Sequence, residues 1–355
     1  MRSNCNLFLY VLVFTLFNCT HYTEYKTKKT NNAEDFFELY DNGYIFIEKG
    51  DLIEKKIVND KVISRQLSSN TYDTIYKPDQ EIYKNIDNVV ALSDIHGQYD
   101  LAIDILKNNK IINNTLDWNY GKGHLVIVGD IFDRGSKVNE MLWLVYKLEK
   151  QAKNEGGRVH FILGNHEYMV LHKNLKYVDE EYLLITKLLD MDYDQLYSNR
   201  TIIGRWLRSK PTILKINEDI FVHGGISKDF LSSNSFNIKK INEVMRKSIG
   251  RSKEEMTAKG FYDNYFGKKG PVWYRGYFRD NLEDQHISKI LKQIDSDHII
   301  VGHCSNNEVV QLFDNKIFGV DSSIKKGEYG EVLFIEKGIY SRGTRNGRRV
   351  QFNKH

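Results

Sequence analysis

The chain has 355 residues, of which 41% are hydrophobic and 28% are charged, an ordinary globular composition. This composition excludes a collagen-like or broadly disordered chain, and three cysteines exclude a disulfide-dense scaffold and a four-cysteine zinc site. The 51 basic and 47 acidic residues leave a net charge of only +4, whereas a protein that binds the nucleic-acid backbone is usually more basic. We therefore expect no nucleic-acid partner.

The first residues are typical of an export signal rather than of the fold. Arg2 precedes an apolar run over Leu7–Phe17, which is too short to span a bilayer and has the length of a signal-peptide core. Leu16-Phe17-Asn18-Cys19 resembles a bacterial lipobox, although small residues are usual before the cysteine. We expect a signal peptide over 1–18 and a lipidated Cys19 that attaches the protein to a membrane of the cell envelope, facing the periplasm or the exterior. A plain secretory signal and an uncleaved anchor are the alternatives.

Residues 19–35 are polar and are predicted to form a tether, and residues 36–85 are predicted to form a small β-rich extension. Tyr44–Glu48, Leu52–Val58 and Val62–Leu67 are apolar or alternating, and turn residues separate them, which predicts a β-meander. With about 50 residues, this extension is too small for a stable core of its own. We therefore expect it to dock on the catalytic body.

From residue 86 to residue 340 the sequence predicts one α/β catalytic domain. Short apolar runs are predicted to be buried strands, and stretches with helical spacing separate them. The runs are Val89–Leu92, Leu125–Val128, Val159–Leu163, Ile220–Val222 and Ile299–Val301; the helical stretches are Leu101–Ile112, Lys137–Lys153 and Tyr182–Leu189. Strands that alternate with helices indicate a layered α/β architecture. Residues 341–355 carry four arginines and are predicted to form a basic, solvated tail.

Polar residues with glycine neighbours follow each of the five predicted strands. The sequences at these positions are Ser93-Asp94-Ile95-His96-Gly97, Gly129-Asp130-Ile131-Phe132-Asp133-Arg134-Gly135, Gly164-Asn165-His166-Glu167, His223-Gly224-Gly225 and Gly302-His303. Because open α/β sheets bind ligands at the carboxyl ends of their strands, we expect these side chains to meet in one site. A lone histidine beside a strand is more often structural, but five such sequences in order are not expected by chance.

Six of these residues form a mixed nitrogen and oxygen ligand set: Asp94, His96, Asp130, Asn165, His223 and His303. Imidazole suits Zn and Fe, and carboxylates suit harder ions such as Mn, so the set predicts two divalent metal ions (Mn, Fe or Zn) that share a bridging carboxylate. Two such ions, about 3.5–4 Å apart, stabilise the attacking and leaving oxygens of an in-line phosphoryl displacement and lower the pKa of a bound water.

The order of these motifs resembles that of the calcineurin-like metallophosphoesterases, specifically the phosphoprotein phosphatase group, over roughly Val89–Leu333. The segments His223-Gly224-Gly225-Ile226-Ser227 and Gly270-Pro271-Val272-Trp273-Tyr274-Arg275-Gly276 are most similar to the bacterial Shewanella-like protein phosphatases. Ser93, Leu163 and Cys304 depart from the residues usual in the group, and none of them removes a ligand. The resemblance implies a central β-sandwich flanked by helices.

The resemblance also implies a role for each site residue. Asp94 and His96 hold the first metal, Asp130 bridges both, and Asn165, His223 and His303 hold the second. A metal-bridged hydroxide attacks phosphorus in line, and His166 is the general acid that protonates the leaving oxygen, with Asp133 orienting it.

Two arginines complete the implied set, and Glu167 is expected to be structural rather than a ligand. Arg134 and Arg275 bind the phosphoryl oxygens, because the planar guanidinium matches phosphate geometry. For Arg275, stacking on Trp273 or Tyr274, or simple surface exposure, is the alternative. Since an alkoxide is a poor leaving group, a positioned acid such as His166 accelerates the reaction by about 10²–10⁴-fold.

We therefore expect a dimetal phosphomonoester hydrolase of protein-phosphatase type that acts on a phosphorylated protein or a small phosphoester. Phosphoserine, phosphothreonine and phosphotyrosine remain open. The alternatives are a dinucleoside polyphosphate hydrolase that acts on compounds such as diadenosine tetraphosphate, a general envelope phosphoesterase, a nuclease or phosphodiesterase, and a non-catalytic binding lipoprotein. Export argues against a dinucleoside polyphosphate hydrolase, and the near-neutral charge argues against a nuclease. The complete ligand set argues against a binding protein.

Overall fold

The computed structural model describes residues 40–352. The expected signal peptide over 1–18, Cys19 and the tether over 19–35 lie outside these residues. Within residues 40–352, no helix combines the length and the apolar composition that crossing a bilayer requires.

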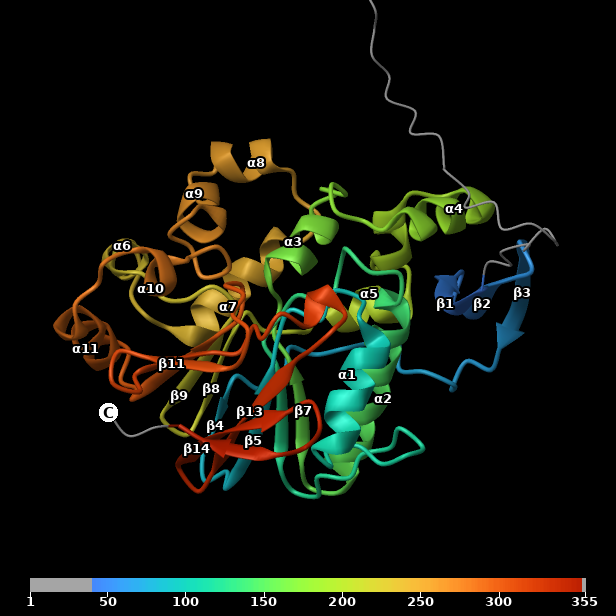
Figure 1. Cartoon of the computed structure of the whole chain (residues 1–355). Helices are drawn as coiled ribbons and strands as arrows, with labels where there is room; N and C mark the ends of the chain where they lie inside the picture. The colour runs from blue at the N-terminus through green and yellow to red at the C-terminus, as the bar shows by residue number, and fades with distance from the viewer. Residues whose placement is uncertain (1–39, 353–355) are drawn as a thin grey trace, which may run out of the picture. The chain divides into compact units, whose positions relative to one another are not determined.

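Two six-stranded sheets form the centre of the described body (Figure 1). The first has the strand order β11-β12-β10-β9-β8-β4, and the second has the order β15-β14-β13-β5-β6-β7. The strands of the first sheet are β4 (Ile82–Tyr83), β8 (Ile213–Ile216), β9 (Asp219–Val222), β10 (His298–Val301), β11 (Val310–Leu312) and β12 (Ile317–Gly319). Those of the second are β5 (Asn88–Leu92), β6 (His124–Ile127), β7 (Arg158–Phe161), β13 (Glu331–Glu336), β14 (Ile339–Thr344) and β15 (Arg349–Gln351).

A hydrophobic core joins the two sheets into a sandwich. Buried side chains from both sheets contact one another in it, including Val89, Val126, Leu214, Phe221, Ile300 and Leu333. β5, β6 and β7 are parallel neighbours, and so are β9, β10 and β12. Parallel neighbours end at the same edge of a sheet, which brings the polar sequences after these strands together.

Helices surround the sandwich. They are α1 (Tyr99–Asn108), α2 (Val138–Asn154), α3 (Asn165–Leu171), α4 (Glu180–Leu189), α5 (Ile202–Leu207), α6 (Lys228–Ser233), α7 (Ile238–Ser248), α8 (Lys253–Ala258), α9 (Tyr262–Phe266), α10 (Gly276–Arg279) and α11 (Asp284–Gln293), with 3-10 turns η1 (Tyr193–Tyr197) and η2 (Ile324–Lys326). In α1, Leu101, Ala102, Ile105 and Leu106 are buried, the spacing of one helical face. The Asn237 side chain begins α7 by accepting the Lys240 N–H.

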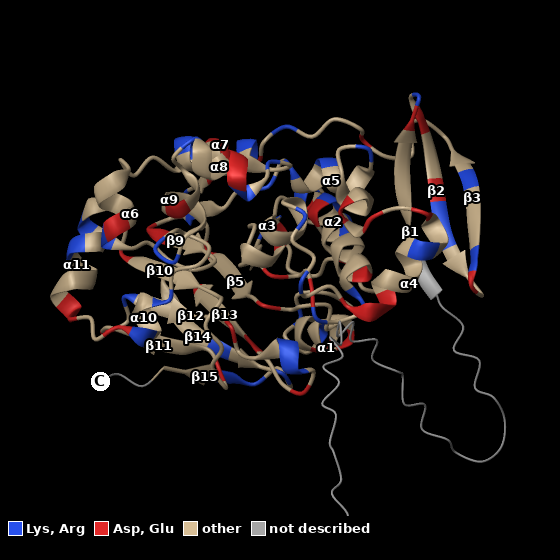
Figure 2. Ribbon diagram, turned by 90° about the horizontal axis from the view of Figure 1, so that it is seen from above, with Lys and Arg blue, Asp and Glu red and all other residues tan. Residues whose placement is uncertain are grey.

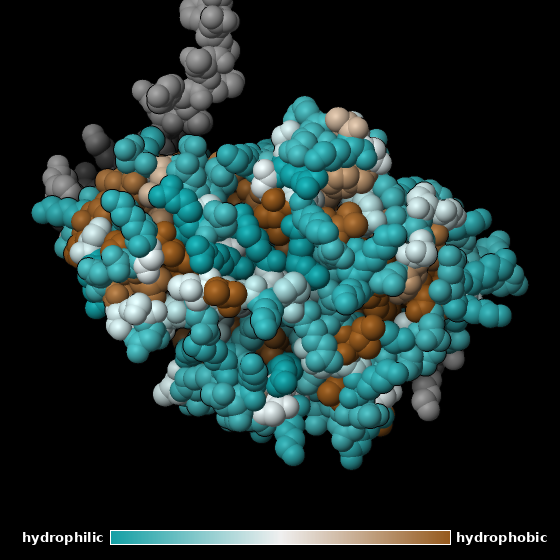
Figure 3. All heavy atoms as spheres, turned by 180° about the vertical axis from the view of Figure 1, so that it is seen from behind, coloured by the Kyte–Doolittle hydropathy of each residue, from teal (hydrophilic) through white to brown (hydrophobic). Residues whose placement is uncertain are grey.

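Three antiparallel strands form the predicted meander: β1 (Tyr40–Glu48), β2 (Asp51–Val58) and β3 (Lys61–Leu67). The meander docks on the body, because Asn139 Nδ2 and Trp143 Nε1 both donate to the Gly43 carbonyl and the Ile47 N–H donates to the Arg200 carbonyl at 2.7 Å. Figure 3 shows hydrophobic surface gathered at this end of the molecule, on the left of that view.

The structure differs from the expected basic tail over 341–355, and from the expected domain start at residue 86. Residues 341–344 and 349–351 belong to β14 and β15, which extend the second sheet, and β4 pairs with β8 before residue 86. Three of the four arginines lie beside carboxylates: Arg342 Nε is 3.2 Å from Glu331, Arg345 Nη2 is 3.0 Å from Asp104, and Arg349 Nη2 is 3.3 Å from Glu336. Glu331 and Asp104 belong to other elements, β13 and α1, and the local run of arginines does not show these partners.

Candidate active site

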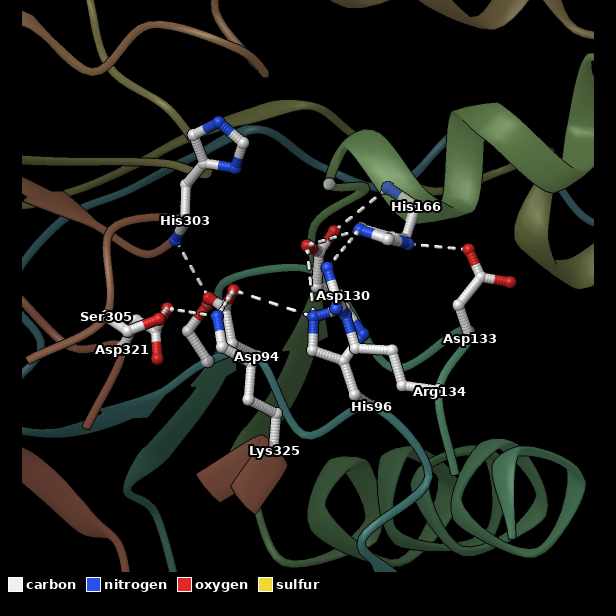
Figure 4. Close-up of polar contacts among 12 residues, drawn as sticks. Asp94, His96, Asp130, Asp133, Arg134, His166, His303, Ser305, Asp321 and Lys325 are labelled. Carbon is white, nitrogen blue, oxygen red and sulfur yellow. Dashed lines mark hydrogen bonds and ion pairs between the residues drawn. The ribbon is translucent and has the colours of Figure 1, made fainter. Parts of the chain in front are cut away.

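The predicted site residues meet at the carboxyl ends of β5, β6, β7, β9 and β10 (Figure 4). All six predicted metal ligands are buried, and His303 is the most exposed at 8%. Asp130 lies in the middle of the set and contacts histidines from three different strand ends. The structure therefore brings together the residues that the strand-end pattern of the sequence singled out.

The loops that carry these residues have an unusual backbone. Asp94, His96, Asp130, Asp133 and Arg134 adopt positive φ angles of 55°, 47°, 59°, 71° and 72°. The left-handed region is unfavourable for residues other than glycine. Such residues remain in it only where the surrounding structure enforces this, typically at functional sites. The tight turns aim the polar side chains back over the sheet edge.

One group of donors surrounds the His223 ring. Its Nε2 atom lies 3.1 Å from Asp130 Oδ2, 2.9 Å from Asn165 Oδ1 and 3.2 Å from His303 Nδ1. The ligand atoms of Asp130, His223 and His303 all lie within 4.8 Å of one another. These four side chains are the ones expected to hold the second metal.

A second group shares Asp130 with the first. His96 Nε2 lies 3.6 Å from Asp130 Oδ2 and 3.8 Å from Asp94 Oδ1. A His166 nitrogen also lies within 4.8 Å of the His96 and Asp130 ligand atoms. Because Asp130 belongs to both groups, the geometry fits a carboxylate that bridges two ions.

Backbone carbonyls set the orientation of two of the imidazoles. His96 Nδ1 is 2.7 Å from the Phe132 carbonyl, and His223 Nδ1 is 2.8 Å from the Val128 carbonyl. A carbonyl can only accept, so Nδ1 carries the proton in both rings. In the neutral rings Nε2 then carries the lone pair that can bind a metal, and donation of the other ring N–H to a carbonyl is usual for metal-binding histidines.

Buried negative charge dominates the electrostatics of the site. Burial disfavours the charge of Asp94 and Asp130, yet neighbouring histidines hold the pKa of both carboxyls well below the usual range. Burial likewise opposes protonation of His223, but Asp130 and Asp94 overcome it and raise its pKa to about 9. Burial and the nearby His223 charge lower the pKa of His303. Positive charge therefore stabilises the cluster of carboxylates. Protons on the histidines supply only part of this charge, whereas divalent cations supply it fully.

Glu167 has a structural role, as expected. Its buried carboxylate accepts the backbone N–H groups of Asp130 at 2.8 Å, Ile131 at 2.8 Å and Gly164 at 2.7 Å. Glu167 thereby holds the loop after β6 against the start of α3, and its oxygens are occupied by this loop rather than by a metal.

His166 lies between a carboxylate and a guanidinium. Its Nδ1 atom is 2.5 Å from Asp133 Oδ2, and its Nε2 atom is 3.5 Å from Arg134 Nη2. The carboxylate fixes the ring so that Nε2 faces the metal-ligand cluster, 4.0 Å from Asp130. This is the arrangement expected of a positioned acid.

These groups open into a cavity of about 550 Å³, which we call the strand-end cavity. Arg134, Arg275, Arg279 and Lys325 supply cations to its wall. The Arg275 guanidinium lies 5.5 Å from the centre of the Trp273 ring and also lines the cavity, so contact with Trp273 does not remove Arg275 from the cavity wall. The aromatic side chains of the wall are Tyr177, Trp273 and Phe278.

Several residues of the cavity wall were not predicted from the sequence. Tyr177 contacts both the His166 ring, with centroids 5.3 Å apart, and the Arg134 guanidinium, at 5.2 Å. Lys325 Nζ lies 3.8 Å from Asp94 and 3.1 Å from the buried Asp321. The strand-end rule would have found Asp321, because it follows β12, whereas nothing local singles out Tyr177.

Comparison with known proteins gives the class. Residues 88–304 match the family described as calcineurin-like phosphoesterase, and the chain belongs to this family. Such enzymes typically bind two divalent metals, which the His and Asp groups fit. The predicted family, the layered α/β fold with its N-terminal strands, and the identity as a metal-dependent phosphoesterase are confirmed.

Individual relatives indicate which group of calcineurin-like phosphoesterases this chain resembles. The cold-active protein-tyrosine phosphatase of a psychrophilic Shewanella species has 38% identity and a TM-score of 0.85, over 88% of this chain and 99% of that one. Shewanella-like protein phosphatase 1 of Plasmodium berghei is 27% identical over 264 residues, 70% of this chain and 72% of that protein. Shewanella-like protein phosphatase 2 of Arabidopsis thaliana is 22% identical, over 70% of this chain and 74% of that protein. The chain is thus similar to Shewanella-like protein phosphatases over most of the catalytic domain.

Proposed function

We propose that the protein removes phosphate from phosphotyrosine side chains of proteins. The observation that carries this proposal is the meeting, in one cavity, of the metal-ligand cluster, the His166–Asp133 pair and two arginines. Tyr177, Trp273 and Phe278 give this cavity aromatic walls, which suit an aryl phosphate. The relative with 38% identity is described as a protein-tyrosine phosphatase, which favours the same substrate class.

In the proposed mechanism, Asp94 and His96 would hold one ion, Asn165, His223 and His303 the other, and Asp130 both. The mixed donors suit Mn, Fe or Zn. When bound, the pair supplies Lewis acidity and a water of lowered pKa.

The protein's own side chains supply the remaining steps. Arg134 and Arg275 bind the non-bridging phosphoryl oxygens and orient the ester for in-line displacement. The His166 Nε2–H group gives its proton to the leaving phenolate oxygen, and Asp133 holds the ring and its positive charge through Nδ1.

We further propose that the enzyme works outside the cytoplasm of a bacterium, attached to a membrane through lipid on Cys19. The apolar run Leu7–Phe17 followed by Leu16-Phe17-Asn18-Cys19 supports this proposal. Labelling cells with a fatty-acid analogue should mark the wild-type chain and leave Cys19→Ser unmarked. An unlabelled wild-type chain would refute lipidation, and a wild-type chain recovered from the cytosol would refute export.

The decisive experiment compares substrates on the metal-reconstituted protein. A phosphotyrosine peptide, a phosphoserine peptide, diadenosine tetraphosphate and a phosphodiester are assayed side by side, with bound metal quantified per chain. We expect the phosphotyrosine peptide to be hydrolysed fastest, with His166→Asn and Asp94→Asn both impaired. Faster turnover of phosphoserine would correct the substrate, and turnover of the dinucleotide alone would overturn the phosphatase proposal.

A further inference from the structure

A second cavity of about 430 Å³ lies where the meander meets the body, and we call it the junction cavity. Its wall comes from β1 and β2, the end of α3, η1, the segment before α5 and the residues after α7. Among the described residues it shares no lining side chain with the strand-end cavity. It is therefore a separate site, and the proposed reaction does not use it.

The charges of this wall do not balance. Its two carboxylates are already paired, Glu48 with Lys55 at 3.2 Å and Asp194 with Lys173 at 3.6 Å. Arg200 and Arg208 also line the wall, and within residues 40–352 no carboxylate lies at ion-pair distance from either. Figure 2 shows basic residues on β2 and around α5, the elements on either side of this junction. Two cations are thus left without a counter-charge.

Arg208 is held in place rather than free in solvent. Its Nη1 atom donates to the Tyr197 carbonyl at 2.7 Å and to the Gly204 carbonyl at 2.6 Å, while its other nitrogens have no partner in the described part of the chain. Burial lowers the pKa of this guanidinium to about 10, and no nearby charge offsets that cost. A fixed, partly desolvated arginine is an arrangement that favours binding of a carboxylate or phosphate-type oxygen.

The wall also contains four apolar side chains beside the polar Gln195, Ser198 and Asn199. Phe46 is 6% exposed, and Leu171, Met191 and Ile249 complete the apolar lining. Small-molecule sites commonly combine apolar walls with a few polar groups that fix orientation. The combination here suits a ligand with an apolar body and an anionic head group.

We propose that the junction cavity binds a small organic anion, whose carboxylate or phosphate-type head group contacts Arg200 and Arg208 and whose apolar body lies against Phe46, Leu171 and Met191. Because these two cations lack a counter-charge within residues 40–352, a doubly charged head group binds more tightly than a singly charged one. The ligand touches Leu171, the last residue of α3, which begins with Asn165 and His166. Binding therefore stabilises the helix that carries the acid of the proposed reaction.

Calorimetric titration of the metal-loaded full chain tests the proposal, with phenylphosphonate and benzoate as probes that share a ring and differ in head group. Both probes can also bind at the metal cluster, so the titration is repeated on Asp130→Asn. We expect binding that persists in Asp130→Asn, weakens at least tenfold in Arg200→Gln and Arg208→Gln, and is tighter for the phosphonate. Tighter benzoate binding with the same dependence on the two arginines would keep the site and assign it to carboxylates.

The matched control is Arg205→Gln. Arg205 lies in α5, between Arg200 and Arg208 in the sequence, but its guanidinium donates to the Asn199 and Thr74 carbonyls and does not line the cavity. We expect this variant to bind the probes as the wild type does. If Arg208→Gln fails to fold by circular dichroism, Arg200→Gln decides, because that side chain is exposed. Binding that disappears in Asp130→Asn, or that is unchanged in Arg200→Gln, would overturn the proposal.

Discussion

Replacing Asp133 with asparagine removes one negative charge and little else. Asp133 is buried, its Oδ2 atom contacts His166 Nδ1 at 2.5 Å, and its Oδ1 atom has no partner among the described residues. Asparagine has the same shape and tolerates the positive φ of 71° at this position. The amide oxygen can still accept from Nδ1, so the His166 ring keeps its place while its positive charge loses support.

The expected loss of kcat follows from the single contact between Asp133 and His166. A hydrogen bond to a charged group contributes about 1.5–3 kcal/mol. Since about 1.36 kcal/mol in the barrier changes a rate tenfold, kcat should fall by about 10- to 100-fold. Removing the acid itself in His166→Asn should cost about 10²–10⁴-fold.

The assay uses aryl phosphates whose leaving phenols span a range of pKa values. A good leaving group departs without a proton, so the loss in Asp133→Asn should be small for nitrophenyl phosphate and largest for phenyl phosphate or a phosphotyrosine peptide. Adding Asp133→Asn to His166→Asn should cost nothing further, because the carboxylate acts only through the imidazole.

Two results would refute this reasoning. An equal loss for every leaving group would mean that Asp133 supports the site in another way, for example by holding the loop after β6. An undiminished effect of Asp133→Asn in the His166→Asn background would show that the two residues act independently. Thermal unfolding of each variant separates both cases from simple loss of fold.

Three further predictions rest on other contacts. Tyr177→Ala should lower kcat/KM for phosphotyrosine peptides by about fivefold, because a ring contact with Arg134 of about 1 kcal/mol is lost; Tyr177→Phe should retain activity, and an equal loss in both would implicate the hydroxyl instead. Metal binding at pH 7 should release at least one proton, since His223, with its pKa raised to about 9, is protonated in the metal-free protein; calorimetry in buffers of different ionisation enthalpy measures it, and zero release would contradict the electrostatics. Burial lowers the pKa of His124 to about 4 from its usual 6.5, and its Nδ1 atom lies 3.0 Å from His160. The unfolded chain therefore takes up a proton first, so the contribution to the free energy of unfolding is complete above pH 6.5 and about 3 kcal/mol is lost as the pH falls toward 4; urea unfolding of wild type and His124→Gln should diverge over this range, and parallel curves would refute it.

The sequence was informative about the site because the relevant signal is local. An apolar run of four or five residues followed by glycine and a polar residue indicates where a buried strand ends. Parallel strands end at one edge, so the chain order alone leads one to expect that Asp94, Asp130 and His223 meet. The same local patterns predicted α2 and the three meander strands to within a few residues.

Partners that lie far apart in the chain could not be read in this way. Residues 341–355 were predicted to form a solvated tail, because the carboxylates beside their arginines come from other elements, such as Glu331 and Asp104. Tyr177 has the sequence neighbours of any loop aromatic, and only the folded chain brings its ring against His166.

The junction cavity could not be predicted from the sequence either. Arg200 and Arg208 have ordinary sequence neighbours, and only the docking of the meander makes them part of a wall with Phe46. Hydrophobic periodicity and glycine placement act within a few residues, so the sequence alone determined the five strands that precede the site, their ends and the polar residues placed there. Which side chains face one another across those elements depends on packing between distant segments, and that was decided by the tertiary structure.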